Sequence, residues 1–157
     1  MSTLYLIRHA DAGDRSAWVG DDDLRPLSKK GRRQSNGLAV RLQAEGLTRL
    51  ISSPSLRCIE TLEPLADVTG LRVETDARLV EGSDGPAALQ LADELRELGD
   101  TAVLCSHGDV IPDLLSELRI LGTSFHHALT WPKASTWVLT SNGTHWTDAH
   151  FVPRPDS

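Results

Sequence analysis

The sequence predicts an α/β fold: a three-layer α/β/α sandwich with a mostly parallel central sheet. Short apolar runs alternate with longer amphipathic stretches, a pattern typical of strands joined by crossover helices. Each amphipathic stretch is followed by glycine, at Gly46, Gly70, Gly99 or Gly122. Glycine commonly ends a helix because it adopts the left-handed conformation. The length of 157 residues indicates one domain, expected over residues 1–152 with a flexible tail at 153–157.

Five short apolar segments predict strands. They are Leu4–Ile7, Leu50–Ile51, Leu71–Val73, Thr101–Cys105 and Thr136–Thr140. A further strand over 145–150 is expected to pair with the last of these, because Asn142-Gly143 is a strong hairpin turn signal.

Four amphipathic stretches predict helices. They run from Ser28 to about Glu45, from Ser53 to Gly70, from Ala87 to Leu98 and from Val110 to Leu121. Ser28 and Ser53 are placed to cap the first two helices, and Pro54 follows Ser53 at a position where helices accept proline. Residues 10–27 and 76–86 are expected to be loops.

Charge and composition narrow the functional classes. The net charge of −6, from 16 basic and 22 acidic residues, argues against a nucleic-acid-binding protein. No apolar run approaches the length of a membrane span, and no signal peptide is apparent, so the expected location is cytoplasmic. Cys58 and Cys105 belong to no C-x-x-C motif, and we expect both to be buried free thiols.

Two predicted strands end in histidine. Arg8 and His9 follow the first strand, His107 follows a later one, and Arg57 lies four residues after Ser53 at the end of the second. Because ligands bind beyond the carboxyl ends of parallel strands, these side chains are expected to face one crevice. Two guanidinium groups and two imidazoles would repel one another unless an anion lay between them, and guanidinium matches phosphate oxygens well.

Each of these residues alone also has a structural explanation. A histidine after a strand is commonly a packed loop residue, and Arg8 could pair with Asp21, Asp22 or Asp23. The combination favours the anion site, because three separate signals occur in the order that the fold requires.

The same motifs carry a family resemblance. They are Leu6–Ala10, Leu27–Gln34, Ser52–Arg57, Thr61 and Ser106–Gly108. In these residues the chain resembles the histidine phosphatase (phosphoglycerate mutase-like) superfamily, and the resemblance extends from residue 4 to about 140. Its short length is similar to that of the SixA-type phosphohistidine phosphatases. The stretches Leu24–Lys29, Thr61–Ala66 and Val110–Leu114 are also similar to the C-terminal phosphatase-like domain of actinobacterial two-domain Nudix hydrolases.

The resemblance implies a mechanism for the four residues at the strand ends. His9 would attack phosphorus and form a phosphohistidine, which water then hydrolyses. Arg8 and Arg57 would keep His9 neutral and hold the phosphoryl charge, and His107 would bind an equatorial oxygen. No metal and no cofactor are expected, because the arginines take the place of Mg²⁺.

Glu81 is the candidate general acid. It lies in Leu79-Val80-Glu81-Gly82, and family members often carry a similar L-x-E pattern there. The alternative is an ordinary solvated loop carboxylate. No binding role is assigned to a set of outer residues that could contact a substrate. These are Arg15, Trp18, Arg25, Lys29 and Lys133.

A second group of histidines raises the question of a metal site. They are His126, His127, His145 and His150. Their spacings match no common ligand motif, so surface or packing roles are expected and no metal is assigned.

The sequence lacks the motifs of several other classes of phosphoryl-transfer enzyme. A thiol phosphatase needs arginine six residues after its cysteine. The residue at that position is Pro64 for Cys58 and Ile111 for Cys105, so neither cysteine fits. An aspartyl-phosphate enzyme would place D-x-D directly after the first strand, where His9 stands instead. No phosphate-binding G-x-x-x-x-G-K-[ST] loop occurs.

Four functions remain open. The first is a phosphatase acting on a phosphohistidine protein or a small phosphate ester, and the others are a nucleotide phosphatase, a phosphomutase and a non-catalytic phosphate-binding protein. A short segment between Arg57 and His107 predicts an open site, which favours hydrolysis over a mutase. The sequence indicates neither the substrate nor the oligomeric state.

Overall fold

The computed structural model describes residues 2–155, which form a seven-stranded sheet of order β3-β2-β4-β1-β6-β7-β5. The strands are β1 (Thr3–Arg8), β2 (Arg49–Ser52), β3 (Val73–Thr75), β4 (Ala102–Ser106), β5 (Ser124–Phe125), β6 (Thr136–Ser141) and β7 (Trp146–Val152). Only β6 runs antiparallel to its neighbours β1 and β7, and the other pairs are parallel. The predicted mostly parallel sheet is confirmed.

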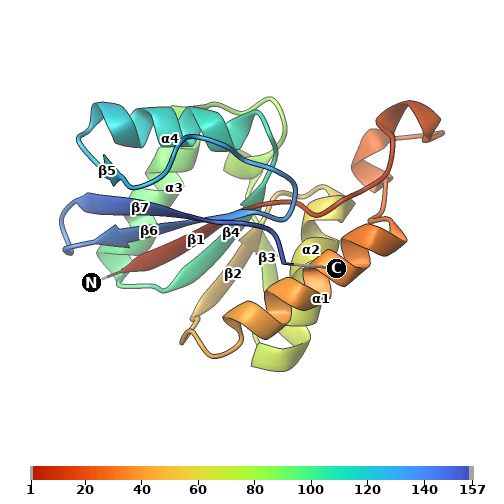
Figure 1. The fold of residues 1–157 in the computed structure, drawn as a ribbon, viewed down its shortest axis with the longest axis horizontal. Coiled ribbons are helices and arrows are strands. Elements are labelled where there is room, and N and C mark those ends of the chain that lie inside the picture. Colours follow the sequence, from red (N-terminus) through yellow and green to blue (C-terminus); the bar gives the residue numbers. More distant parts are fainter. Residues whose placement is uncertain (1, 156–157) are drawn as a thin grey trace.

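Helices cover both faces of this sheet. They are α1 (Lys29–Leu42), α2 (Leu56–Thr69), α3 (Gly85–Leu98) and α4 (Val110–Ile120). Figure 1 shows α1 and α2 on one face and α3 and α4 on the other, which confirms the predicted three-layer sandwich. Three 3-10 turns lie in the loops: η1 (Arg15–Ala17), η2 (Asp22–Leu24) and η3 (Ala77–Leu79).

Alternation along the central strands divides the apolar residues between two cores. In β1, Leu4 and Leu6 pack with the residues of α3 and α4, whereas Tyr5 and Ile7 pack with those of α1 and α2. Successive side chains of a strand point to opposite faces, so one strand serves both layers. All five residues of β4 are buried, as expected for a strand with helices on both sides.

The start of α1 is fixed to the segment that follows β1. The Ser28 hydroxyl caps the helix by accepting from the Gly31 amide at 3.0 Å and donates to Asp11 Oδ2 at 2.6 Å. A Cβ at position 31 would collide with the Asp11 carbonyl group, so glycine lets the helix approach the backbone there. This contact holds the chain just beyond His9.

The start of α2 differs from the prediction. Ser55, not Ser53, is the N-cap, and Leu56 is the first helical residue. The Ser53 amide donates to the Cys105 carbonyl at 2.9 Å, so β-type pairing with the end of β4 continues one residue past β2. The Ser53 hydroxyl is therefore not a helix cap and contacts His107 instead.

The C-terminal end of the described chain lies against α1. Arg41 donates to the Pro153 carbonyl at 2.6 Å, and Pro155 is buried beside Gly37. The tail predicted to be flexible begins at residue 153; Pro153 and Arg154 are exposed there, and Pro155 is buried. Residues 156 and 157 lie outside the described part. The strand β5 was not predicted, because two residues give no periodic signal.

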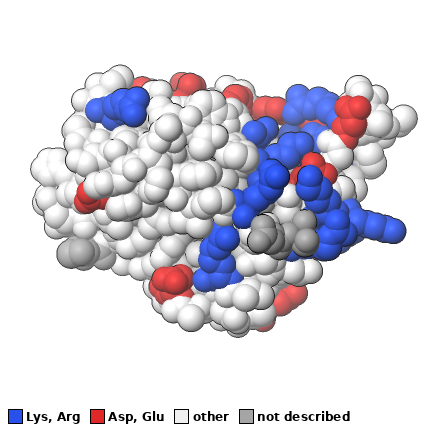
Figure 2. Space-filling view, in the orientation of Figure 1, with Lys and Arg blue, Asp and Glu red and all other residues white. Residues whose placement is uncertain are grey.

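The surface charge is unevenly distributed. Helix α1 carries five basic residues, Lys29, Lys30, Arg32, Arg33 and Arg41, and no acidic one. Figure 2 shows a band of lysine and arginine over the region where α1 and the C-terminal end lie in Figure 1. A basic face thus exists on a chain of net charge −6. Within residues 2–155, no helix is long and apolar enough to cross a membrane.

Candidate active site

His9 lies at the end of β1 with only 6% of its surface exposed. Its Nδ1 is 2.8 Å from the Ala10 carbonyl oxygen. A carbonyl oxygen only accepts, so Nδ1 carries the proton and donates, and the neutral ring keeps an unprotonated Nε2. The backbone thereby selects the tautomer in which Nε2 has a free lone pair.

The surroundings of His9 also keep its ring neutral. Burial lowers the pKa of His9 to about 3, and electrostatic interactions with His107, Arg57 and Arg8 act in the same direction. The hydrogen bond to Ala10 opposes this shift. His9 is therefore a neutral base over the whole range in which a free imidazole would titrate.

His107 follows β4 and faces His9 edge-on, with ring centroids 5.5 Å apart. Its Nδ1 lies 3.4 Å from Arg57 Nη2, and its Nε2 lies 2.9 Å from Ser53 Oγ. Since arginine can only donate, Nδ1 of His107 accepts, and its Nε2–H points to Ser53. Ser53 is thus the residue that orients His107.

Arg57 enters the cluster from the first turn of α2 and is fully buried. Its Nη1 donates to the Asp22 carbonyl at 2.9 Å, and its Nη2 lies 3.3 Å from Glu81 Oε2 and 3.3 Å from Asp22 Oδ2. Its Nε is buried without a hydrogen-bond partner among the described residues.

Arg8, like Arg57, has a buried Nε without a hydrogen-bond partner among the described residues. Its Nη1 donates to the Trp131 carbonyl at 3.0 Å. The guanidinium packs on Gly108, where a Cβ would lie 2.8 Å from Arg8 Cζ. Unsatisfied buried donors are costly and rare. Two of them on arginines that flank paired histidines indicate a site prepared for an oxyanion.

The backbone of Arg8 and His9 is held from two further elements. The Ala134 amide donates to the carbonyls of Arg8 and His9, at 3.0 and 3.2 Å, and Thr61 Oγ1 of α2 accepts from the Ala10 amide at 3.0 Å. Ala134 has a φ of 63°, a conformation that L-residues adopt at a cost and that occurs often near functional sites.

Glu81 reaches the same cluster from the loop after η3. Its Oε1 is 2.6 Å from Arg15 Nη2, and its other oxygen faces Arg57. The Asp109 carboxylate accepts from the Gly82 amide at 2.8 Å and fixes this loop against the start of α4. The side chain of Glu81 is 38% exposed, so it lies at the outer rim of the cluster.

The structure therefore brings together all five residues that the sequence singled out. Glu81 contacts Arg57, Arg57 contacts His107, and the His107 ring faces His9. Arg8 precedes His9 and lies against Gly108, the residue after His107.

The expectation of an open site is wrong for this conformation. His107 is 1% exposed and Arg57 is not exposed at all, because the segment after His9 folds over them. Asp22 of η2 pairs with Arg57, with Arg25 Nε at 2.9 Å and with Arg15 at 3.5 Å. Burial opposes a low pKa for Asp22, but the Arg25 hydrogen bond and the three arginine charges lower it, so this carboxylate is charged.

Sequence reasoning missed the roles of Asp22, Ser53 and Cys58. Asp22 was considered as a partner for Arg8, yet it binds Arg57. Ser53 was interpreted as a helix cap. Cys58 is buried as predicted, but its Sγ lies 3.6 Å from His107 Nε2. The position of Cys58 directly after Arg57 was the available signal, because the first turn of α2 faces the site.

The outer residues divide into packed and exposed groups. Arg25 is buried and donates to the Ala12 carbonyl at 2.7 Å. It thereby supports the segment after His9 that covers His107 and Arg57 (the covering segment). Lys133 lies 3.5 Å from Asp11, and Trp18 Nε1 donates to the Asp21 carbonyl. Lys29 is exposed at the start of α1.

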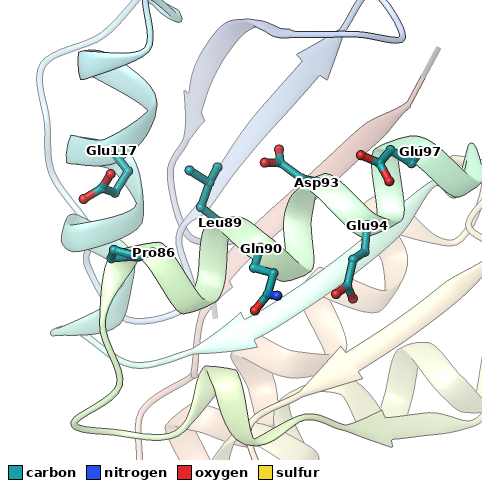
Figure 3. A pocket seen from close by; sticks show the side chains of 7 residues that line it. All are labelled: Pro86, Leu89, Gln90, Asp93, Glu94, Glu97 and Glu117. Atoms are coloured by element: carbon teal, nitrogen blue, oxygen red, sulfur yellow. The ribbon is translucent and has the colours of Figure 1, made fainter.

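A pocket elsewhere on the surface has the wrong charge for phosphate. It has a volume of about 420 Å³ and lies on α3 beside α4 (Figure 3). Its lining residues are Pro86, Leu89, Gln90, Asp93, Glu94, Glu97 and Glu117. Four carboxylates would repel a phosphoryl group, so the cluster around His9 remains the candidate site.

The fold and the cluster define the class of protein. A neutral buried imidazole faces a second imidazole between two arginines with free N–H groups, at the carboxyl ends of parallel strands. This is an α/β protein with a buried cluster of two histidines and two arginines at one edge of its sheet.

Comparison with known proteins gives the family. Residues 4–98 match the family model of the histidine phosphatase superfamily (branch 1), and the chain belongs to this superfamily. It is 33% identical over 157 residues to an 8-oxo-(d)GTP phosphatase of Mycolicibacterium smegmatis, a match that covers 98% of this chain and 49% of that protein. The chain thus spans about half the length of this relative.

Two further comparisons show proteins that the chain is similar to. A probable phosphoglycerate mutase, GpmB, of Yersinia enterocolitica is 28% identical over 151 residues, which cover 91% of this chain and 70% of that protein. The structure of the protein histidine phosphatase SixA complexed with tungstate superposes with a TM-score of 0.77 at 22% identity, covering 98% of this chain and 96% of that one. The last match shows a shared fold.

Proposed function

We propose that this chain is a metal-independent phosphatase that transfers a phosphoryl group from its substrate to His9 and then to water. The observation that carries this proposal is the state of His9. Its Nδ1 is committed to the Ala10 carbonyl, and its neutral Nε2 lies among two arginines and a second imidazole. A nucleophilic nitrogen beside groups that attract phosphate is what phosphoryl transfer through histidine requires.

In the first step, His9 Nε2 attacks phosphorus as the bond to the leaving group breaks. The N–P bond forms, and the leaving oxygen or nitrogen takes a proton from Glu81, which must first have bound that proton in place of one of its pairs with Arg15 and Arg57. The free Nε groups of Arg8 and Arg57 hold two phosphoryl oxygens. His107 binds a third when its Nε2–H turns from Ser53 Oγ to the phosphoryl group. These fixed donors stabilise the transition state without having to reorganise.

In the second step, water attacks the phosphohistidine. Glu81 takes a proton from the water, the N–P bond breaks, inorganic phosphate leaves and His9 is restored. The arginines carry the charge that Mg²⁺ carries in other phosphoryl-transfer enzymes. Catalysis therefore needs no metal ion and no cofactor.

For the substrate, we propose a phosphohistidine protein, as in the SixA enzyme, or a small phosphate ester. The resemblance to the 8-oxo-(d)GTP phosphatase supports a nucleotide as the second candidate. The GpmB relatives keep a phosphomutase as an alternative, and a non-catalytic phosphate-binding protein is the fourth. We place the protein in the cytoplasm, with no membrane or nucleic-acid partner.

One assay tests the chemistry before the substrate is known. The chain is incubated with p-nitrophenyl phosphate and EDTA, and wild type is compared with His9→Ala. Full activity in EDTA and its loss in the variant are expected, whereas exposed His145→Ala remains active. Activity that survives in His9→Ala contradicts the assigned nucleophile, and activity lost in EDTA contradicts metal independence.

A substrate panel then separates the candidates. It contains a phosphohistidine peptide, nucleoside di- and triphosphates, sugar phosphates and a phosphoglycerate. Release of inorganic phosphate identifies a phosphatase, whereas an isomeric phosphoglycerate without phosphate release identifies a mutase. Binding of tungstate without turnover of any compound supports the non-catalytic alternative.

A further inference from the structure

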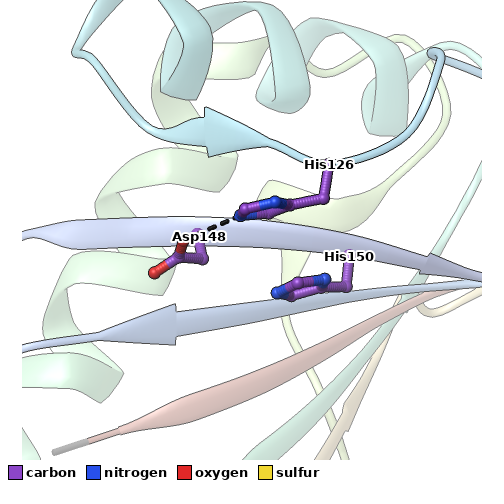
Figure 4. Close-up of side chains that lie close together, drawn as sticks. All are labelled: His126, Asp148 and His150. Atoms are coloured by element: carbon purple, nitrogen blue, oxygen red, sulfur yellow. Dashed lines mark hydrogen bonds and ion pairs between the residues drawn. The ribbon is translucent and has the colours of Figure 1, made fainter.

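A second cluster of ligating side chains lies on the β5–β7 edge of the sheet. It consists of His126, Asp148 and His150, shown in Figure 4. Phe125 pairs with Ala149 in the parallel register of β5 and β7, and the His126 amide donates to the Ala149 carbonyl. This register places His126 beside His150, and Asp148 lies two residues earlier in β7 on the same face.

The three side chains converge. His126 Nε2 lies 2.8 Å from Asp148 Oδ1, and one ligating atom from each residue lies within 4.8 Å of the others. The rings of His126 and His150 stack at a centroid distance of 4.3 Å with an interplanar angle of 4°. Because a metal ion lies in the plane of each imidazole that binds it, one of these exposed rings must turn out of the stack before both can bind one ion. Within residues 2–155, Asp148 makes no ion pair with a lysine or arginine, so its carboxylate is not neutralised by a fixed cation.

We propose that these residues bind one divalent transition-metal ion, with Zn²⁺ as the expected ion. Two imidazoles and one carboxylate are a donor set that Zn²⁺ accepts, and water completes a tetrahedral site on an exposed surface. The ion takes the place of the proton shared by His126 Nε2 and Asp148 Oδ1. The bond between that proton and the His126 nitrogen breaks, the proton leaves to solvent, and the freed lone pair binds the ion; no bond between heavy atoms of the protein is broken.

His127, next to His126 in the chain, is not one of the proposed ligands. His127 Nδ1 accepts from the Phe151 amide at 3.1 Å, so this nitrogen is occupied by the backbone. The ring lies 6.2 Å from that of His150 and covers one side of the cluster. The spacing of the histidines along the chain predicted no metal site, because His126 meets Asp148 and His150 only through β5–β7 pairing.

The place of the cluster in the fold suggests what the ion does. His126 begins the segment that runs to β6, and further along this segment the Trp131 carbonyl binds Arg8 and the Ala134 amide binds the Arg8 and His9 carbonyls. A metal bridge between His126 and β7 fixes the first residue of this segment. The role is structural, and the chemistry at His9 does not use the ion.

Calorimetric titration of the metal-free full chain with ZnCl₂ tests the site. One Zn²⁺ per chain is expected, with a higher melting temperature. His126→Gln and His150→Gln are each expected to weaken binding by roughly 10–100-fold, at least the loss that follows removal of an outer-sphere partner. His145→Gln, on the nearby hairpin, is the matched control and binds as the wild type does.

A second readout identifies the ligands and detects a misfolded variant. In the wild type, imidazole nitrogen signals of His126 and His150 are expected to shift on adding Zn²⁺, while circular dichroism of each metal-free variant matches the wild type. Unchanged binding in folded His126→Gln and His150→Gln overturns the proposal. Binding lost in His9→Ala but kept in His150→Gln also overturns it, because the ion would then lie at the catalytic histidines.

Discussion

Asp22 Oδ2 lies 3.3 Å from Arg57 Nη2, so an internal carboxylate occupies the arginine that we expect to hold the phosphoryl group. The same residue accepts from Arg57 Nη1 through its backbone carbonyl. A substrate phosphoryl group and the Asp22 carboxylate therefore compete for one guanidinium, and substrate binding requires the covering segment to move at least at its side chains.

This competition predicts the effect of Asp22→Asn. The variant keeps the shape of the side chain and loses its charge, so tungstate is expected to inhibit about fivefold more tightly, which corresponds to about 1 kcal/mol. The inhibition constant is measured against p-nitrophenyl phosphate. Asp67→Asn, at an exposed position of α2, is the control. Weaker inhibition in Asp22→Asn would show that the charge of Asp22 is needed to order the site.

The low pKa of His9 predicts an acid-dependent stability. Between pH 6.5 and about 3 the unfolded chain binds a proton at this residue and the folded chain does not. The free energy of unfolding therefore falls as the pH falls through this range, by up to about 1.4 kcal/mol per pH unit from His9.

His9→Asn removes this contribution. Urea unfolding at pH 4.5 and 6.5 is expected to give a smaller difference in unfolding free energy for the variant than for the wild type. His145→Asn is expected to leave the difference unchanged. An equal difference in wild type and His9→Asn would show that His9 is protonated in the folded protein.

The strand ends and helix ends could be predicted because local sequence encodes them. Gly70 and Gly99 are the C-caps of α2 and α3, whereas α1 ends at Leu42, before the predicted Glu45, and Leu121 is the C-cap of α4. The Arg8-His9 pair directly followed an apolar run. The role of Ser53 could not be predicted, because the start of α2 depends on how far the pairing of β2 with β4 continues. That is a property of two segments distant in sequence.

The position of the covering segment could not be predicted from the sequence either. Asp21, Asp22 and Asp23 are equivalent in the sequence, and only packing decides that Asp22 meets Arg57 while Asp23 accepts from the Ser55 hydroxyl. A polar loop has no hydrophobic period that would place it. For this reason the sequence predicted an open site, although its five central residues were found.

Ser53 is a positioning residue, and its removal has a distinct signature. Ser53→Ala leaves the buried His107 Nε2–H with only the weaker acceptor Cys58 Sγ, at 3.6 Å, which is expected to lower the unfolding free energy by about 1 kcal/mol. A change in the His107 tautomer, seen in imidazole nitrogen spectra, distinguishes loss of orientation from a general loss of stability. A wild-type tautomer with reduced activity would contradict this role.

Gly108 controls the place of Arg8. In Gly108→Ala the new Cβ would lie 2.8 Å from Arg8 Cζ, and the flexible guanidinium is expected to move out of the site. We expect kcat/KM to fall by about tenfold or more with little change in the melting temperature. In an Arg8→Ala background the same substitution is expected to cause no further loss. Additive losses would show that Gly108 acts through another group.

Glu81 distinguishes general acid catalysis from a passive ion pair. If Glu81 protonates the leaving group, Glu81→Gln is expected to slow hydrolysis of an alkyl phosphate by about 10²–10⁴-fold. It would slow hydrolysis of p-nitrophenyl phosphate far less, because nitrophenolate leaves without a proton. The ratio of the two rates of phosphorylation is measured in single-turnover experiments.

Arg15→Ala serves as the control for Glu81, because Arg15 holds Glu81 Oε1 at 2.6 Å and has no proton to give at neutral pH. It is expected to slow both substrates by a similar small factor. An equal loss for both substrates in Glu81→Gln would assign Glu81 to positioning Arg57, which it contacts at 3.3 Å. The leaving group would then depart without receiving a proton from the protein. This is possible for a phosphoramidate, because its nitrogen can already carry a proton when the N–P bond breaks. That outcome would favour phosphohistidine over a phosphate ester as the substrate.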